Sequence, residues 1–139
     1  MNTIEQQVVS LDLAKQLKEA GYKQEGLWWW KPDMITKGKD VFLQSESALT
    51  MQLGNHKTIA VAPTVAELGE ALPETIKKKP DYRKKDEKEI YTLEYHEKGL
   101  SVEYIYYYYE PCDYITIKGN TEANARAKMW IYLRKEGLL

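Results

Sequence analysis

The sequence predicts an α+β fold in which three helices pack on an antiparallel or mixed sheet. Near both ends of the chain, and once in the middle, apolar residues recur with helical spacing. Short runs of β-branched and aromatic residues lie between these segments. The resulting order of helix, strands, helix, strands, helix is typical of an α+β domain. With 139 residues and no internal repeat or linker, we expect residues 1–139 to form a single domain.

The first helix is expected to follow Ser10, which can cap it. Asp12 falls in the first turn, where a negative charge suits the helix dipole. Leu13 and Leu17 are spaced to share one apolar face. Gly21 is expected to end the helix, since glycine tolerates the left-handed conformation found there.

Residues 27–30, Leu-Trp-Trp-Trp, predict a strand that Pro32 brings to an end, because proline cannot continue a sheet ladder. Trp28 and Trp30 share one face of that strand, and Trp29 lies on the other. The alternation leaves open which face is buried. Further strands are predicted near residues 41–43 and 57–61, whereas residues 48–53 fit either a strand or a loop.

The central helix is predicted from a capping box formed by Thr64 and Glu67. In such a box the hydroxyl accepts from a backbone N–H of the first turn and the carboxylate returns to the cap. Leu68 and Leu72 fall on one face, and Pro73 limits the length of the helix.

Residues 77–88 are dominated by charge, and we expect them to form an exposed loop. Three acidic residues dilute the basic ones. The basic residues that make this loop a candidate for contact with phosphate are Lys77, Lys78, Lys79, Arg83, Lys84 and Lys85.

A β-hairpin is predicted over residues 90–96 and 100–109, with one wholly apolar face. The register that produces this face places the following residues opposite each other: Tyr95 and Val102, Leu93 and Tyr104, and Tyr91 and Tyr106. The same register sets Glu94 against Glu103, an unfavourable like-charge pair that we expect to point to solvent. The second face would carry Ile105, Tyr107 and Tyr109, together with Thr92 and His96.

A last strand is expected over residues 114–117, followed by a helix that begins at Asn120 or Thr121. This helix is apolar around most of its circumference, so it must be buried in the core. Its one clearly polar stripe is expected to hold Asn124, Lys128 and Lys135.

Composition argues against several classes of function. The net charge of −1 disfavours a general nucleic-acid binder. The single cysteine, Cys112, rules out an internal disulfide. The sequence carries no apolar run long enough to span a membrane and no recognisable secretion signal, so we expect an intracellular protein.

Candidate catalytic groups are sparse. His56 and His96 are far apart, and Cys112 has no partner cysteine with metal-ligand spacing. The glycines form no phosphate-binding loop, and no serine lies in a nucleophile motif. We therefore expect no metal, no cofactor and no enzymatic activity. An unrecognised enzyme would need a deep pocket with convergent polar groups.

Four segments together resemble a family of small uncharacterised proteins encoded by tailed bacteriophages and prophages. They are residues 10–18 with Gly21, residues 27–30, residues 62–70 and residues 120–133. The resemblance implies a phage origin and a place in the host cytoplasm, and it implies no reaction, because the family has no assigned activity.

Two functional hypotheses follow. The first is a phage accessory protein that binds a phage or host protein through exposed aromatic residues, since tyrosine is enriched at interfaces. The candidate residues are Tyr107, Tyr109, Trp28 and Trp30. A helix of the same chain covering the two tyrosines is the alternative. The second hypothesis is an accessory nucleic-acid binder that uses the basic residues between 77 and 85.

Overall fold

The structure, a computed structural model, describes residues 3–33, 35–47, 58–79, 89–96, 100–106 and 113–139. Within these residues the chain forms four helices and two antiparallel sheets, so the predicted α+β class is confirmed. The additional helix is the single turn α1 (Ile4–Gln7). Residues 48–53, His56 and Cys112 lie outside the described residues.

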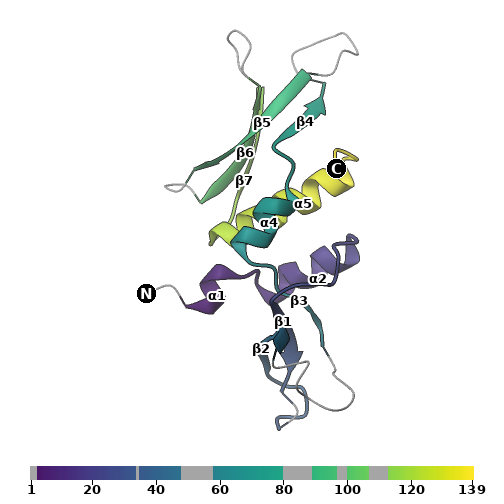
Figure 1. The fold of residues 1–139 in the computed structure, drawn as a ribbon, viewed down its shortest axis with the longest axis vertical. Coiled ribbons are helices and arrows are strands. Elements are labelled where there is room, and N and C mark those ends of the chain that lie inside the picture. Colours follow the sequence, from purple (N-terminus) through teal and green to yellow (C-terminus); the bar gives the residue numbers. More distant parts are fainter. Residues whose placement is uncertain (1–2, 34, 48–57, 80–88, 97–99, 107–112) are drawn as a thin grey trace.

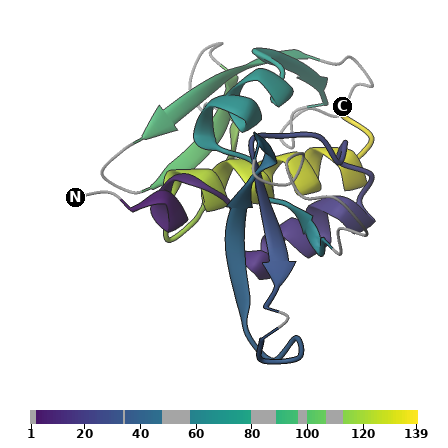
Figure 2. The same cartoon turned by 60° about the horizontal axis from the view of Figure 1, so that its bottom comes forward.

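The helices separate the two sheets. The long helix α5 (Glu122–Lys135) packs against α2 (Leu11–Glu19) on one side and α4 (Val65–Ala71) on another, and it also contacts two strands of the larger sheet. Figures 1 and 2 show the smaller sheet extending from the other side of this helical layer. Eight residues of α5 are buried, which confirms that it is the central core helix.

The three-stranded sheet consists of β1 (Trp28–Pro32), β2 (Val41–Ser45) and β3 (Ala60–Val61), with β1 in the centre. Pro32 is the last residue of β1, where a missing N–H is tolerated. The predicted strand at 57–61 is only two residues long. Both of its residues are buried, and it pairs with Trp29 and Trp30.

The capping box of α4 is confirmed. The Thr64 hydroxyl accepts from the Glu67 backbone N–H at 3.2 Å, and Glu67 Oε2 accepts from the Thr64 backbone N–H at 2.7 Å. The second oxygen of Glu67, Oε1, accepts from the backbone N–H of Leu27 at 3.1 Å. Glu67 therefore caps its own helix and also holds the chain at the start of the three-stranded sheet.

The four-stranded sheet has the order β4 (Thr75–Lys78), β5 (Glu89–His96), β6 (Ser101–Tyr106) and β7 (Asp113–Lys118). The predicted pairs Tyr95–Val102, Leu93–Tyr104 and Glu94–Glu103 are all confirmed.

The prediction of a charged loop over residues 77–88 is wrong for its first two residues, and residues 80–88 lie outside the described residues. Lys77 and Lys78 belong to β4, where they pair with Ile90 and Glu89. The segment forms a strand because Ile76 is buried in the core. Side chains alternate along a strand, so the neighbouring Lys77 points away from the core. Charged side chains on an edge strand are common, because they discourage pairing with other chains.

The prediction that Asn124 lies on the polar stripe of the last helix is wrong. Only 5% of the surface of Asn124 is exposed. Its Oδ1 accepts from the Ser10 backbone N–H at 2.9 Å, and its Nδ2 donates to Asn120 Oδ1 at 2.5 Å. Ser10 does occupy the N-cap of α2, but its side chain forms no capping hydrogen bond. Thr121 caps α5 by accepting from the Asn124 N–H.

Candidate binding surface

Alternation along the strands gives the four-stranded sheet two different faces. The inner face meets the helical core through residues that are almost completely buried, namely Ile76, Tyr91, Val102, Tyr104 and Ile115. Helix α5 packs against this sheet at β6 and β7. The residues between the buried ones point the other way. We call this second side the outer face: Thr75, Lys77, Ile90, Thr92, Glu94, His96, Ser101, Glu103, Ile105, Tyr114, Thr116 and Lys118.

The outer face presents large apolar side chains to solvent. Tyr114 is 62% exposed and Ile90 is 54% exposed, and Ile105 is half-buried. Ile105 pairs with Thr92 on one side and with Tyr114 on the other, so these three residues form a row across three strands. Among the described residues, no helix shields Tyr114 or Ile90 from solvent.

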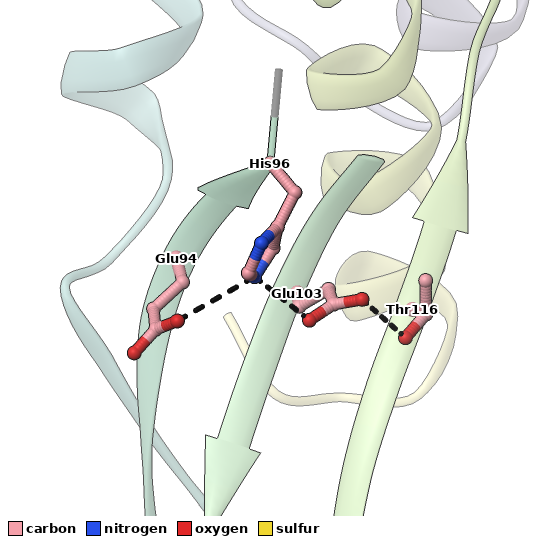
Figure 3. Close-up of polar contacts among 4 residues, drawn as sticks. All are labelled: Glu94, His96, Glu103 and Thr116. Atoms are coloured by element: carbon pink, nitrogen blue, oxygen red, sulfur yellow. Dashed lines mark hydrogen bonds and ion pairs between the residues drawn. The ribbon is translucent and has the colours of Figure 1, made fainter. Parts of the chain in front are cut away.

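A polar cluster follows in the next rows of the same face (Figure 3). Glu94 and His96 come from β5, Glu103 from β6 and Thr116 from β7. His96 Nε2 lies 3.0 Å from Glu103 Oε2 and 3.5 Å from Glu94 Oε2. The Thr116 hydroxyl donates to Glu103 Oε1 at 3.0 Å.

His96 explains how the like-charge pair is accommodated. Two carboxylates opposite each other on neighbouring strands are unfavourable. Figure 3 shows the imidazole between Glu94 and Glu103, where its ring nitrogen can donate a hydrogen bond and, when protonated, contribute a positive charge. The side chain of Glu103 is only 20% exposed, so the expectation that both carboxylates point freely to solvent is wrong for Glu103.

The residue types of this cluster suggest a serine nucleophile or a metal site, but their arrangement in the described residues fits neither. Ser101 lies directly opposite His96, yet no hydrogen bond joins the two side chains in the part of the chain that the structure describes. Nothing there activates the serine as a nucleophile. Across the same residues, no group of three or more histidine, cysteine or acidic side chains is placed to hold a metal ion.

The sequence-predicted tyrosines, Tyr107 and Tyr109, lie outside the described residues. The apolar part of the outer face rests instead on Ile90, Ile105 and Tyr114. Tyr114 was not singled out from the sequence. A partial signal was present, because alternation in the last strand puts Tyr114 and Thr116 on one face. The missing information was the pairing of that strand with β6.

The two tryptophan candidates have different surroundings. Trp30 packs against the core, and its Nε1 donates to the Val9 carbonyl at 2.9 Å, which favours a role in packing. Trp28 lines a shallow hollow of about 470 Å³ with Leu27 and the end of β2. Trp29 and its cross-strand partner Gln44 each contain a buried polar atom, Nε1 and Oε1, without a hydrogen bond in the described part of the chain.

The basic candidates are only partly brought together. Lys77 and Lys79 are exposed and Lys78 is half-buried, at the end of β4. Arg83, Lys84 and Lys85 lie outside the described residues. Lys77 shares the outer face with Glu94 and Glu103, so this face has mixed charge and lacks the uniformly basic character of a phosphate-binding surface.

Comparison with known proteins gave no relatives: no family model, no curated protein and no solved structure matches this chain. None of the helices in the described ranges is long and apolar enough to cross a membrane.

Proposed function

We propose that this chain is a non-enzymatic accessory protein that binds another protein through the outer face of its four-stranded sheet. The observation that carries the proposal is the exposure of Tyr114 and Ile90 on a face that no described helix covers. Exposed apolar residues that gather on one face, with polar residues around them, are typical of protein interaction sites.

The composition of the face supports a protein partner. Tyrosine supplies a large, rigid ring with a polar end, and it is enriched where proteins meet. Ile105 extends the apolar strip, while Glu94, His96 and Glu103 offer hydrogen-bonding groups beside it. This combination of an apolar centre and a polar margin matches the usual anatomy of an interface.

The resemblance to phage proteins suggests in which cell the chain acts and where its partner comes from. On that basis the partner is a phage or host protein, and the chain acts in the cytoplasm of the host cell. The sequence segments that carry the resemblance include α2, α4, α5 and most of β1. They lie largely apart from the outer face, so the residues that carry the resemblance are not the ones proposed to bind the partner.

Differential capture tests the proposal. The wild-type chain, Tyr114→Ser and Phe42→Ser are immobilised separately and exposed to extract from the bacterial host. Phe42 is the matched control, since it is 40% exposed but belongs to the three-stranded sheet. We expect a protein that wild type and Phe42→Ser retain equally and that Tyr114→Ser loses. Retention by Tyr114→Ser with loss by Phe42→Ser would move the site to the other sheet.

Nucleic-acid binding is the second candidate, and it rests on the exposed Lys77 and Lys79. It predicts that a single-stranded oligonucleotide binds with an affinity that falls steeply as salt is added. The double variant Lys77→Ser with Lys79→Ser would reduce both the affinity and the salt dependence. Binding that is weak and insensitive to salt would exclude this candidate.

A further inference from the structure

A second hollow, which shares no lining residue with the outer face, lies where three segments meet. Its volume is about 380 Å³. The segment after α2 contributes Tyr22, α4 contributes Glu67 and Glu70, and α5 contributes Trp130. The hollow therefore combines residues of two helices with residues of the segment that follows α2, and Tyr22 and Trp130 connect it to the core.

The position of Tyr22 follows from the way α2 ends. Gly21 has a φ of +92°, which reverses the chain at the helix terminus. The Gly21 N–H then donates to the Lys18 carbonyl at 3.1 Å, and the Tyr22 N–H donates to the Leu17 carbonyl at 2.8 Å. These two hydrogen bonds form a Schellman motif, and they direct Tyr22 toward α5.

Tyr22 and Trp130 form an aromatic wall. Their ring centroids are 5.1 Å apart and the ring planes meet at 77°, an edge-to-face contact. Trp130 is buried, with 8% of its surface exposed, whereas Tyr22 is half-buried, so Tyr22 forms the more exposed part of the wall that lines the hollow. Aromatic faces carry negative charge density and attract cations.

The polar part of the lining is mainly acidic. Glu67 is held by the two backbone N–H groups that it accepts from, and Glu70 is exposed on the next turn of α4. Glu25 and Lys23, which also line the hollow, pair with each other at 2.8 Å. The negative charge of Glu67 acts on the hydroxyl group of Tyr22. Together with the larger effect of burial, it raises the pKa of Tyr22 to about 12.

We infer that this hollow binds an ammonium group, held by the Tyr22–Trp130 wall and by the carboxylates of Glu67 and Glu70. Aromatic faces beside acidic side chains are the usual means of recognising such cations. A free amine and a lysine side chain of another protein share this chemistry. The site is independent of the proposed protein-binding face.

A matched pair of probes tests the inference. Choline carries the cationic group, and 3,3-dimethyl-1-butanol is its uncharged counterpart of similar shape. Each is titrated into the full chain at constant ionic strength, and the Trp130 indole N–H is followed by NMR. We expect choline to shift this signal saturably and to bind at least about fivefold more tightly than the alcohol. Equal binding of the two probes would overturn the inference.

Two glutamate variants localise the effect. Glu70→Gln removes an exposed carboxylate at the hollow, and we expect it to weaken choline binding about twofold to fivefold. Glu19→Gln is the control, because Glu19 is also an exposed helical residue but lines a different hollow. Identical affinities for the two variants would contradict the assignment.

A third titration, with Nα-acetyl-lysine methylamide, separates the two sources of the ligand. Tighter binding of this probe than of choline assigns the site to a lysine of a protein partner, whereas the reverse order assigns it to a free ammonium compound. Tyr114→Ser should leave all three titrations unchanged, so failure of this inference can be told apart from failure of the proposed protein-binding function.

Discussion

His96 Nε2 lies 3.0 Å from Glu103 Oε2 on the neighbouring strand, and this contact separates Glu103 from the facing carboxylate of Glu94. The pair Glu94 and Glu103 is therefore bridged by His96, which lies two positions after Glu94 on the same strand.

Removing the bridge should destabilise the sheet. We expect His96→Ala to lower the free energy of unfolding by about 0.5–1 kcal/mol, because the two carboxylates then lose the group between them. In a Glu103→Gln background the same substitution should cost less, since one of the charges is gone. Urea unfolding of the four proteins measures this coupling, and equal costs in both backgrounds would show that His96 does not act through Glu103.

Asn124 should be a strong determinant of stability. Asn124→Ala leaves the Ser10 N–H without its acceptor, and we expect a loss of about 1–3 kcal/mol. Lys128→Ala is the control on the same helix, because Lys128 is exposed, and it should change stability by less than about 0.5 kcal/mol. Similar losses for the two variants would contradict the structural role assigned to Asn124.

The contrast between Asn124 and Glu67 shows what the sequence could predict. The capping box of Glu67 joins residues three positions apart, so its pattern is visible locally. The hairpin register was predictable for the same reason, since one apolar face selects it. Asn124 instead bonds to Ser10, 114 positions away, and nothing in the spacing of the last helix reveals that partner.

Only part of the candidate surface could be predicted from the sequence, because the rest depends on pairing between distant segments. Alternation placed Ile105, Thr92 and His96 on one face of the hairpin. The neighbour that completes the apolar row, Tyr114, comes from a strand whose register depends on tertiary pairing. The bridging role of His96 also required side-chain geometry, because the like-charge pair by itself suggested exposure.

Glu67 offers a test of the link between α4 and the three-stranded sheet. Glu67→Gln retains the size of the side chain but replaces one accepting oxygen by an NH₂ group. One of the two backbone N–H groups, of Thr64 or Leu27, then loses its acceptor, and we expect a cost of about 1–2 kcal/mol. Glu70→Gln on the next turn should cost less than about 0.5 kcal/mol. Thermal or urea unfolding compares them, and equal costs would refute the double contact.

The raised pKa of Tyr22 leads us to expect a loss of stability at alkaline pH. Burial, with a smaller effect from Glu67, raises its pKa to about 12, while an unfolded tyrosine has a pKa of about 10. The folded state then holds a proton that the unfolded state releases, so this contribution to stability is complete below about pH 10 and is lost as the pH rises toward 12. Ultraviolet titration of wild type minus Tyr22→Phe should show a phenolate midpoint near pH 12. A midpoint near pH 10 would contradict the buried environment.

One comparison of affinities tests whether the outer face binds the partner protein. The protein that the wild-type chain captures is purified, and its Kd is measured by calorimetry for wild type, Tyr114→Ser and Phe42→Ser. We predict that Tyr114→Ser raises the Kd at least about tenfold, as expected for a tyrosine at the centre of an interface, while Phe42→Ser leaves it unchanged. An unchanged Kd for Tyr114→Ser would contradict this prediction.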